Sequence, residues 1–131
     1  MPQNIALTSE PLIPEKIIPR RYKAVNGAVV SFVGTVRQYS NSGEKISELE
    51  IIPLDGAQKK LEGIAGEIAG RWPIDRADIY IHRRCGRLKV GEIALVAAVC
   101  GVHRQEAFAA CAHIIDRIKA GGITAEKDIP F

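Results

Sequence analysis

The amino-acid sequence predicts an α+β domain with a mostly antiparallel sheet and packed helices. Two segments, 57–72 and 104–120, repeat apolar residues at three-and-four spacing, which is typical of amphipathic helices. Four other segments are rich in β-branched or small apolar residues, as expected of strands: 28–36, 46–54, 78–82 and 93–100. With a short helix near the start, the order is helix, strand, strand, helix, strand, strand, helix, which favours an α+β fold.

Length and composition indicate a single domain over residues 1–131. The chain has 131 residues, of which 47% are hydrophobic and 25% charged, which suits a globular domain with one core. No apolar run approaches the roughly 20 residues needed to cross a bilayer, and residues 1–10 lack the pattern of a secretory signal. Three widely spaced cysteines suit reduced thiols. We therefore expect a soluble cytoplasmic protein that does not bind membranes.

The first half of the chain is predicted to hold one short helix and two strands. Prolines bound a helix or turn at 14–19. The strand at 28–36 ends with Arg37, a polar loop follows at 38–44, and the extended pattern resumes at 46–54. We expect the two strands to be neighbours.

The second half is predicted to hold two helices that flank two strands. Asp55-Gly56 opens the first helix, and Gly121-Gly122 stops the last one. A basic, turn-like stretch around Gly86 and Gly91 separates the two strands. The strand at 93–100 is almost continuously apolar and is therefore expected at the centre of the sheet.

Five basic side chains are candidates for a functional site. They are Arg37 at a strand end, His103 and Arg104 before the last helix, Lys119 at the end of that helix, and Lys127 in the tail. Such groups suit phosphate binding and the stabilisation of an oxyanion. Taken singly, each is more often a solvated surface residue. His103-Arg104 is the stronger candidate, because free backbone N–H groups at a helix start attract anions.

The spacing along the last helix predicts how these residues can share a site. Arg104 and Lys119 are fifteen positions apart, about 22 Å along a helix at about 1.5 Å per residue. One compact ligand could hardly contact both. If both serve one site, the simplest arrangement takes His103 and Arg104 from one protomer of a symmetric dimer. Lys119 and Arg37 then come from the other protomer.

Two other functions are weighed against this one. Cys100 and His103 could form a nucleophilic pair, although a cysteine that ends an apolar strand is usually a core residue. The basic cluster from His82 to Lys89 favours anionic ligands and could bind nucleic acid, but 5% aromatic residues leave little for base stacking. No CxxC pair or glycine-rich phosphate loop occurs, so no metal or cofactor is expected.

Several blocks of the sequence together resemble the large, catalytic subunit of molybdopterin synthase. The blocks occur in order over nearly the whole chain: Glu10-Pro11-Leu12, Gly27–Arg37, Arg71-Trp72-Pro73, His82-Arg83, Gly86-Arg87-Leu88, Val90-Gly91-Glu92, His103-Arg104, Glu106-Ala107-Phe108, Cys111 and Ile115–Lys119. Any single block is weak evidence, but their order and spacing together are specific.

The resemblance implies an α/β hammerhead-type fold and a homodimer within a heterotetramer. The partner would be a small ubiquitin-like sulfur carrier whose C-terminal Gly-Gly thiocarboxylate enters the active site. The substrate would be cyclic pyranopterin monophosphate, which receives two sulfurs to form the dithiolene of molybdopterin. By this resemblance Arg37, His103, Arg104 and Lys119 match active-site positions, with His103 and Arg104 serving the neighbouring protomer.

The tail departs from the family pattern. The family usually has a second catalytic lysine after Lys119, whereas an ungapped alignment places Glu126 there and Lys127 one residue later. A shift of one residue would return Lys127 to the site. The segment 51–56 also lacks a Tyr-Glu pattern that is common in the family. The alternative to an active synthase is therefore a catalytically weak paralogue that binds the carrier or the pterin without turnover.

Overall fold

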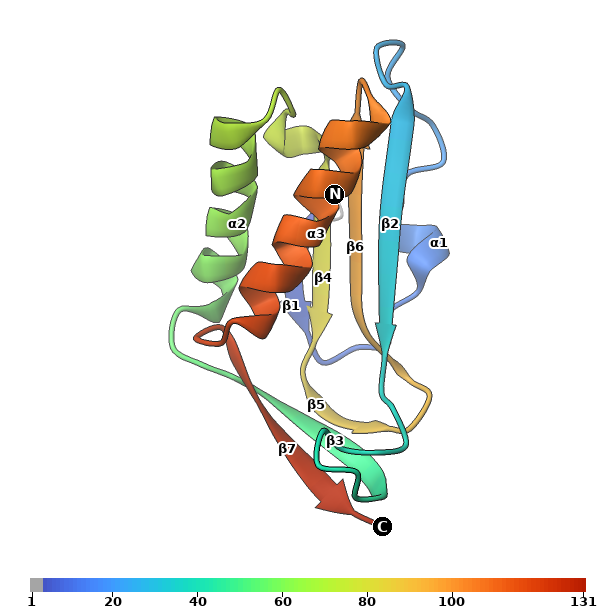
Figure 1. Ribbon diagram of the computed structural model, residues 1–131, viewed down its shortest axis with the longest axis vertical. Coiled ribbons are helices and arrows are strands. Elements are labelled where there is room, and N and C mark those ends of the chain that lie inside the picture. Colours follow the sequence, from blue (N-terminus) through green and yellow to red (C-terminus); the bar gives the residue numbers. More distant parts are fainter. Residues whose placement is uncertain (1–3) are drawn as a thin grey trace.

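A computed structural model describes residues 4–131 as two β-sheets with helices packed against the larger one (Figure 1). The strands are β1 Ile5–Thr8, β2 Ala28–Thr35, β3 Ile46–Pro53, β4 Ile79–Arg84, β5 Gly86–Lys89, β6 Ile93–Gly101 and β7 Thr124–Pro130. The helices are α1 Pro14–Ile17, α2 Ala57–Arg71 and α3 Arg104–Lys119, with a 3-10 turn, η1, at Arg76–Asp78. The mostly antiparallel α+β architecture that the sequence predicts is confirmed.

The larger sheet has the strand order β1-β4-β6-β2, in which only β1 and β4 pair in parallel. The strand β6 lies between β4 and β2, and every residue from Ala94 to Gly101 is buried. The prediction that this strand is central is confirmed. Its nearly continuous apolar sequence follows from being covered on both faces.

The smaller sheet has the order β5-β3-β7 and extends beyond one end of the larger sheet (Figure 1). Two expectations are corrected here. The strands β2 and β3 are not neighbours, because β2 pairs with β6 in one sheet while β3 lies between β5 and β7 in the other. The turn-like stretch after residue 85 begins with a strand, β5, and the polar segment that forms β7 carries no strand pattern.

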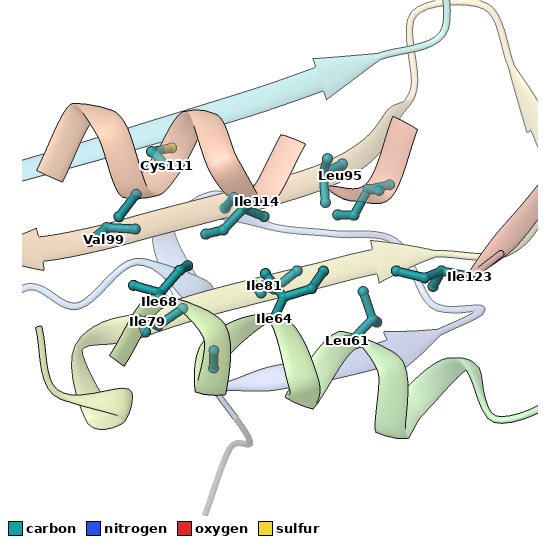
Figure 2. Packing of buried hydrophobic residues seen from close by; sticks show 14 of the residues in the cluster. Leu61, Ile64, Ile68, Ile79, Ile81, Leu95, Val99, Cys111, Ile114 and Ile123 are labelled. Atoms are coloured by element: carbon teal, nitrogen blue, oxygen red, sulfur yellow. The ribbon is translucent and has the colours of Figure 1, made fainter. Parts of the chain in front are cut away.

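One face of the larger sheet is covered by α2 and α3, which enclose the main core (Figure 2). Leu61, Ile64 and Ile68 of α2 meet Ile114 of α3 over Ile81 of β4, all fully buried. Burying an isoleucine or leucine side chain contributes about 1.5–3 kcal/mol, so this layer holds the helices on the sheet. A smaller apolar cluster lies between the two sheets and includes Val36, Ile51 and Leu88.

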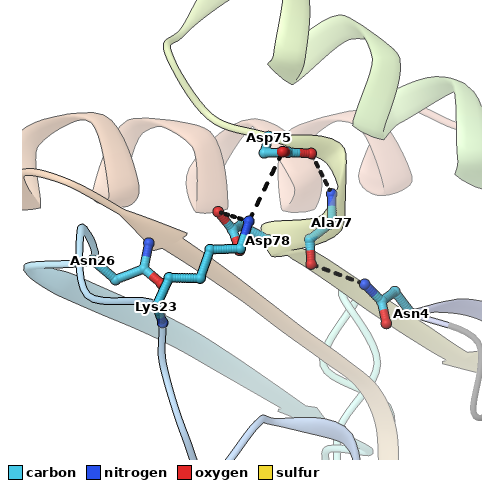
Figure 3. Close-up of polar contacts among 6 residues, drawn as sticks. All are labelled: Asn4, Lys23, Asn26, Asp75, Ala77 and Asp78. Atoms are coloured by element: carbon cyan, nitrogen blue, oxygen red, sulfur yellow. Dashed lines mark hydrogen bonds and ion pairs between the residues drawn. The ribbon is translucent and has the colours of Figure 1, made fainter.

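An ion pair ties the segment that leads from α1 to β2 to the η1 turn (Figure 3). Lys23 Nζ lies 3.2 Å from Asp78 Oδ1 and 3.8 Å from Asp75 Oδ2. The hydrogen bond to Asp78 raises the pKa of Lys23. Asp75 also accepts a hydrogen bond from Ala77 N at 3.0 Å, and Asn4 donates to Ala77 O at 3.0 Å.

Within residues 4–131 no helix is long and apolar enough to cross a bilayer.

A second ionic contact joins α2 to α3, and it predicts how the stability of the fold depends on pH. Glu67 accepts from Arg117 Nε at 3.0 and 3.2 Å and lies 3.3 Å from His113 Nε2. Burial alone would raise the pKa of Glu67, but the hydrogen bonds from Arg117 and His113 outweigh it and hold the pKa below 4.5. A carboxylate with a lowered folded-state pKa stabilises the fold above its unfolded pKa, and this stability is lost as the pH falls through the folded value.

Glu67→Gln is therefore expected to lower the free energy of unfolding by about 0.5–1 kcal/mol at pH 7, as for an exposed ion pair. The difference from the unsubstituted protein should shrink once the pH falls below 4.5. Urea unfolding at pH 7 and at lower pH measures both. Glu62→Gln on the same helix is the control, since its contact with Gln58 is a single hydrogen bond that glutamine can also accept. A deficit that is independent of pH would contradict the ionic explanation.

Candidate active site

A cavity of about 610 Å³ is lined by residues from both sheets and by Lys119 at the C-terminal end of α3. Its walls come from the end of β2 and the following loop, from β3, the end of β4, the start of β6, the end of α3 and β7. The polar and charged side chains among its lining residues are Thr35, Arg37, Tyr39, Ser40, Asn41, Arg83, Lys119, Glu126 and Asp128. Of the five predicted site residues, the cavity therefore brings together Arg37 and Lys119.

Lys119 is the last residue of α3 and lies at the rim of the cavity. Gly121 and Gly122 follow with φ of 91° and 88°, a left-handed conformation that residues other than glycine rarely adopt, and the chain then enters β7. This reversal brings Glu126 back toward Lys119, whose Nζ lies 3.9 Å from Glu126 Oε1. The Lys119 side chain is 64% exposed, so its ammonium group is available to a ligand in the cavity.

Arg83 and Glu126 form the most buried charged contact in the cavity. Neither is among the five site residues predicted from the sequence, although Glu126 aligns with the family's second lysine. Arg83 Nη2 donates to Glu126 Oε1 at 2.9 Å and to Thr124 Oγ1 at 3.3 Å, and the Arg83 side chain is only 3% exposed. A signal was present in the β4 sequence. Arg83 shares the inward face of the strand with Ile79 and Ile81, so a charge at that register indicates an internal partner.

Arg37 follows β2 and lines the cavity, and its guanidinium donates to the Asn41 side chain. Arg37, Arg83 and Lys119 give the cavity three cations against the carboxylates of Glu126 and Asp128. Because Glu126 neutralises Arg83, the balance leaves a single excess positive charge, which is compatible with an anionic ligand.

Lys127 is not among the residues that line the cavity within the described chain. Successive side chains of a strand point to opposite faces, and Glu126 and Asp128 occupy the cavity side of β7. Lys127 is therefore directed to the other face, where its register partner on β3 is Glu50. The structure thus brings Glu126, and not Lys127, next to Lys119.

His103 and Arg104 lie at the opposite end of α3 from the cavity. His103 is the N-cap residue, its backbone N–H donates to Glu106 Oε1 at 2.7 Å, and its side chain is 79% exposed. The 16 residues of α3 span about 24 Å, so neither residue can reach the cavity of its own chain. This separation agrees with the distance expected from the sequence.

The two alternative functions are weakened by the structure. The basic cluster is largely neutralised, because Arg83 pairs with Glu126, Arg84 with Glu92 at 3.3 Å, and Arg87 with Glu48 at 3.0 Å. Cys100 is buried, and this burial raises the pKa of its thiol, with a smaller contribution from Asp78. The thiol therefore does not readily become a nucleophilic thiolate. Residues 4–131 contain no group of three His, Cys, Asp or Glu side chains that could hold a metal ion.

Comparisons with known proteins agree on one family. The family model described as MoaE protein matches residues 7–121. A relative from Nostoc sp. named molybdopterin synthase catalytic subunit is 38% identical over 118 residues, which cover 88% of this chain and 70% of the relative.

Solved structures share the fold. The crystal structure of molybdopterin synthase from Staphylococcus aureus superposes with a TM-score of 0.87 at 31% identity and covers 100% of this chain and 94% of that one. A complex of subunits 1 and 2 of molybdopterin-converting factor from Helicobacter pylori has a TM-score of 0.61 at 18% identity over 79% of this chain and 66% of that one, a likeness of fold. Sequence and structure together show that this chain belongs to the MoaE family of molybdopterin synthase catalytic subunits.

Proposed function

We propose that this chain is the catalytic subunit of a molybdopterin synthase. It transfers sulfur from the C-terminal Gly-Gly thiocarboxylate of a small ubiquitin-like carrier subunit to cyclic pyranopterin monophosphate, and so forms the dithiolene of molybdopterin. The observation that carries the proposal is the cavity with Lys119 at its rim and Arg37 on its wall, in a chain of this family. The carrier supplies the sulfur, so the chain itself has to provide only binding and electrostatic groups.

Lys119 has the central chemical role in this proposal. Once the thiocarboxylate sulfur has bonded to the pterin, water attacks the acyl carbon of the resulting thioester and negative charge develops on the acyl oxygen. An ammonium group within reach stabilises that charge while the carbon–sulfur bond breaks, so that the sulfur stays on the pterin and the carrier leaves as a carboxylate. The same group can donate a proton as the sulfur moves to the pterin. The high exposure of Lys119 allows its ammonium to meet both the carrier tail and the substrate in the cavity.

Arg37 has the role of an anion-binding residue. Its guanidinium lines the cavity and already donates to an amide oxygen, that of Asn41. A planar guanidinium can bind two phosphate oxygens with two parallel N–H donors in a fixed geometry, whereas a lysine ammonium acts as a movable point charge. We assign it to the phosphate of the pterin and to the oxyanion that forms at the acyl carbon of the carrier's C-terminal glycine.

His103 and Arg104 serve the cavity of the partner protomer. They lie at the opposite end of α3 from the cavity of their own chain, and their position at a helix start suits binding of an anionic substrate. The active assembly in this proposal is a homodimer of the chain that binds one carrier at each end, a heterotetramer with two composite sites.

The test of the function is conversion of cyclic pyranopterin monophosphate to molybdopterin. The protein is mixed with thiocarboxylated carrier, and a carrier that ends in an ordinary carboxylate is the control. Product that requires the thiocarboxylate supports the proposal. Carrier binding without product would favour the catalytically weak paralogue. The position of Glu126 is the structural argument for that alternative, because its carboxylate lies beside the ammonium group of Lys119.

Composite sites make a separate prediction about mixtures of inactive variants. Lys119→Ala and Arg104→Ala damage different protomers' contributions, so a mixed dimer contains one site that carries both substitutions and one site that carries neither. We expect each variant alone to be impaired and the mixture to recover up to about a quarter of the normal turnover under random subunit exchange. Exchange is verified by mass spectrometry. Recovery of no activity despite exchange would show that each site is built within one chain.

A further inference from the structure

We propose that Glu126, itself fixed by Arg83, is a positioning residue that holds the ammonium group of Lys119 over the cavity. The inference rests on the proposed function only in that Lys119 is the proposed catalytic residue. Three charged groups are involved, and one carboxylate oxygen, Glu126 Oε1, contacts both cations at 2.9 Å from Arg83 and 3.9 Å from Lys119.

Arg83 is the immobile part of this arrangement. Its side chain is 3% exposed and donates to Thr124 Oγ1 and Ala94 O in addition to Glu126. Its Nε is buried without a hydrogen-bond partner among the described residues. A guanidinium stays charged inside a protein, and a buried charge requires a counter-ion. Glu126 is the carboxylate that meets this requirement.

The backbone of Glu126 is held as firmly as its side chain. It pairs in register with Ile51, which is 1% exposed, and the neighbouring Thr124 is also buried against Arg83. Buried neighbours therefore fix the position of both the Glu126 backbone and the Glu126 carboxylate. The Glu126 side chain remains 38% exposed, and both Glu126 and Lys119 line the cavity.

Lys119, in contrast, has a long flexible side chain that is 64% exposed at the end of a helix. Such a side chain samples many rotamers unless a contact restrains it. At 3.9 Å the contact with Glu126 is an ion pair and not a short hydrogen bond, so a ligand oxygen can replace it while the 2.9 Å bond between Arg83 and Glu126 remains. Glu126 thus restrains Lys119 without blocking it.

The test compares Glu126→Gln with the unsubstituted protein in two independent measurements. Glutamine can still accept a hydrogen bond from Arg83, so the protein should fold with reduced stability, but glutamine lacks the charge that attracts Lys119. In the carrier-dependent assay we expect kcat to fall by about ten-fold while KM for the pterin changes less than about two-fold, because misplacement of a catalytic group affects the chemical step. Glu126→Asp, which keeps the charge, should recover part of kcat.

The second measurement needs no turnover. Lysines are labelled by reductive methylation with ¹³C, which preserves their charge, and the NMR signal of Lys119 is identified by its loss in Lys119→Arg. We expect Glu126→Gln to move the Lys119 signal and to leave that of Lys127, on the opposite face of β7, in place.

The outcomes separate this inference from the proposed function. A moved Lys119 signal together with reduced kcat supports positioning. If the unsubstituted protein shows no turnover but the Lys119 signal moves in Glu126→Gln, the positioning of Lys119 by Glu126 is supported. Only the proposed synthase function is then overturned. An unmoved Lys119 signal overturns the inference, whether kcat is unchanged or reduced. A reduced kcat without a shift of the Lys119 signal would mean that Glu126 acts on the ligand directly.

Discussion

Lys119→Ala is expected to lower carrier-dependent turnover by about 10²- to 10³-fold, the effect of removing one group that stabilises a developing oxyanion. The substitution truncates an exposed side chain at the end of α3 and removes only the longer of the two contacts that Glu126 Oε1 makes. The free energy of unfolding should therefore change by less than about 0.5 kcal/mol. Single-turnover kinetics with saturating carrier measure the first effect, and urea unfolding measures the second.

Lys127→Ala is the matched control for this experiment. It removes the same functional group eight positions later in the chain, but on the face of β7 away from the cavity. We expect its turnover to equal that of the unsubstituted protein. If Lys127→Ala were the damaging variant and Lys119→Ala harmless, the family's second lysine would have been replaced by Lys127, as the sequence alone allowed, and the role given to Lys119 would be wrong.

Glu126→Lys is expected to lower the free energy of unfolding by about 2–3 kcal/mol. From the sequence alone, this substitution would look like the repair of a missing catalytic lysine. In the structure it removes the carboxylate that neutralises a guanidinium with 3% exposure and places a second cation beside it. Breaking a buried ion pair by removing one partner costs several kcal/mol, and the partial exposure of residue 126 reduces that cost.

Urea unfolding at pH 7 tests this expectation, with Lys127→Gln as a control of similar position but on the opposite face of β7. The control should stay within about 0.5 kcal/mol of the unsubstituted protein. Turnover of Glu126→Lys should fall as well, because Lys119 then has a cation as its neighbour. A variant as stable as the starting protein, with equal or higher activity, would show that Arg83 does not depend on Glu126.

The long amphipathic helices and the central strand could be predicted because their signals are local. In α3, Ala107, Cys111 and Ile114 recur at helical spacing, and in β6 the run from Ala94 to Val99 is apolar throughout. Both patterns indicate which faces of the element are buried, and they depend only on residues within that element. The stop at Gly121-Gly122 is local for the same reason, since a left-handed backbone favours glycine.

The strands β5 and β7 could not be predicted in the same way. Their residues are mostly exposed and polar, and their pairing with β3 connects positions that lie far apart in the sequence. Hydrogen bonds between distant backbones leave little trace in composition. The expectation that β2 and β3 are neighbours was wrong for a related reason, because proximity in sequence is a weak guide when two sheets meet.

The sequence by itself determined the fold class, the family resemblance and the candidate status of Arg37, His103, Arg104 and Lys119, since all of these depend on residue types and their order. Only the tertiary structure decided which tail residue faces the cavity. In a strand, a shift of one residue moves every side chain to the other face, and the register of β7 against β3 places Glu126 inward and Lys127 outward. That register is a matter of backbone pairing between segments far apart in the sequence, and it brings the Glu126 carboxylate to buried Arg83.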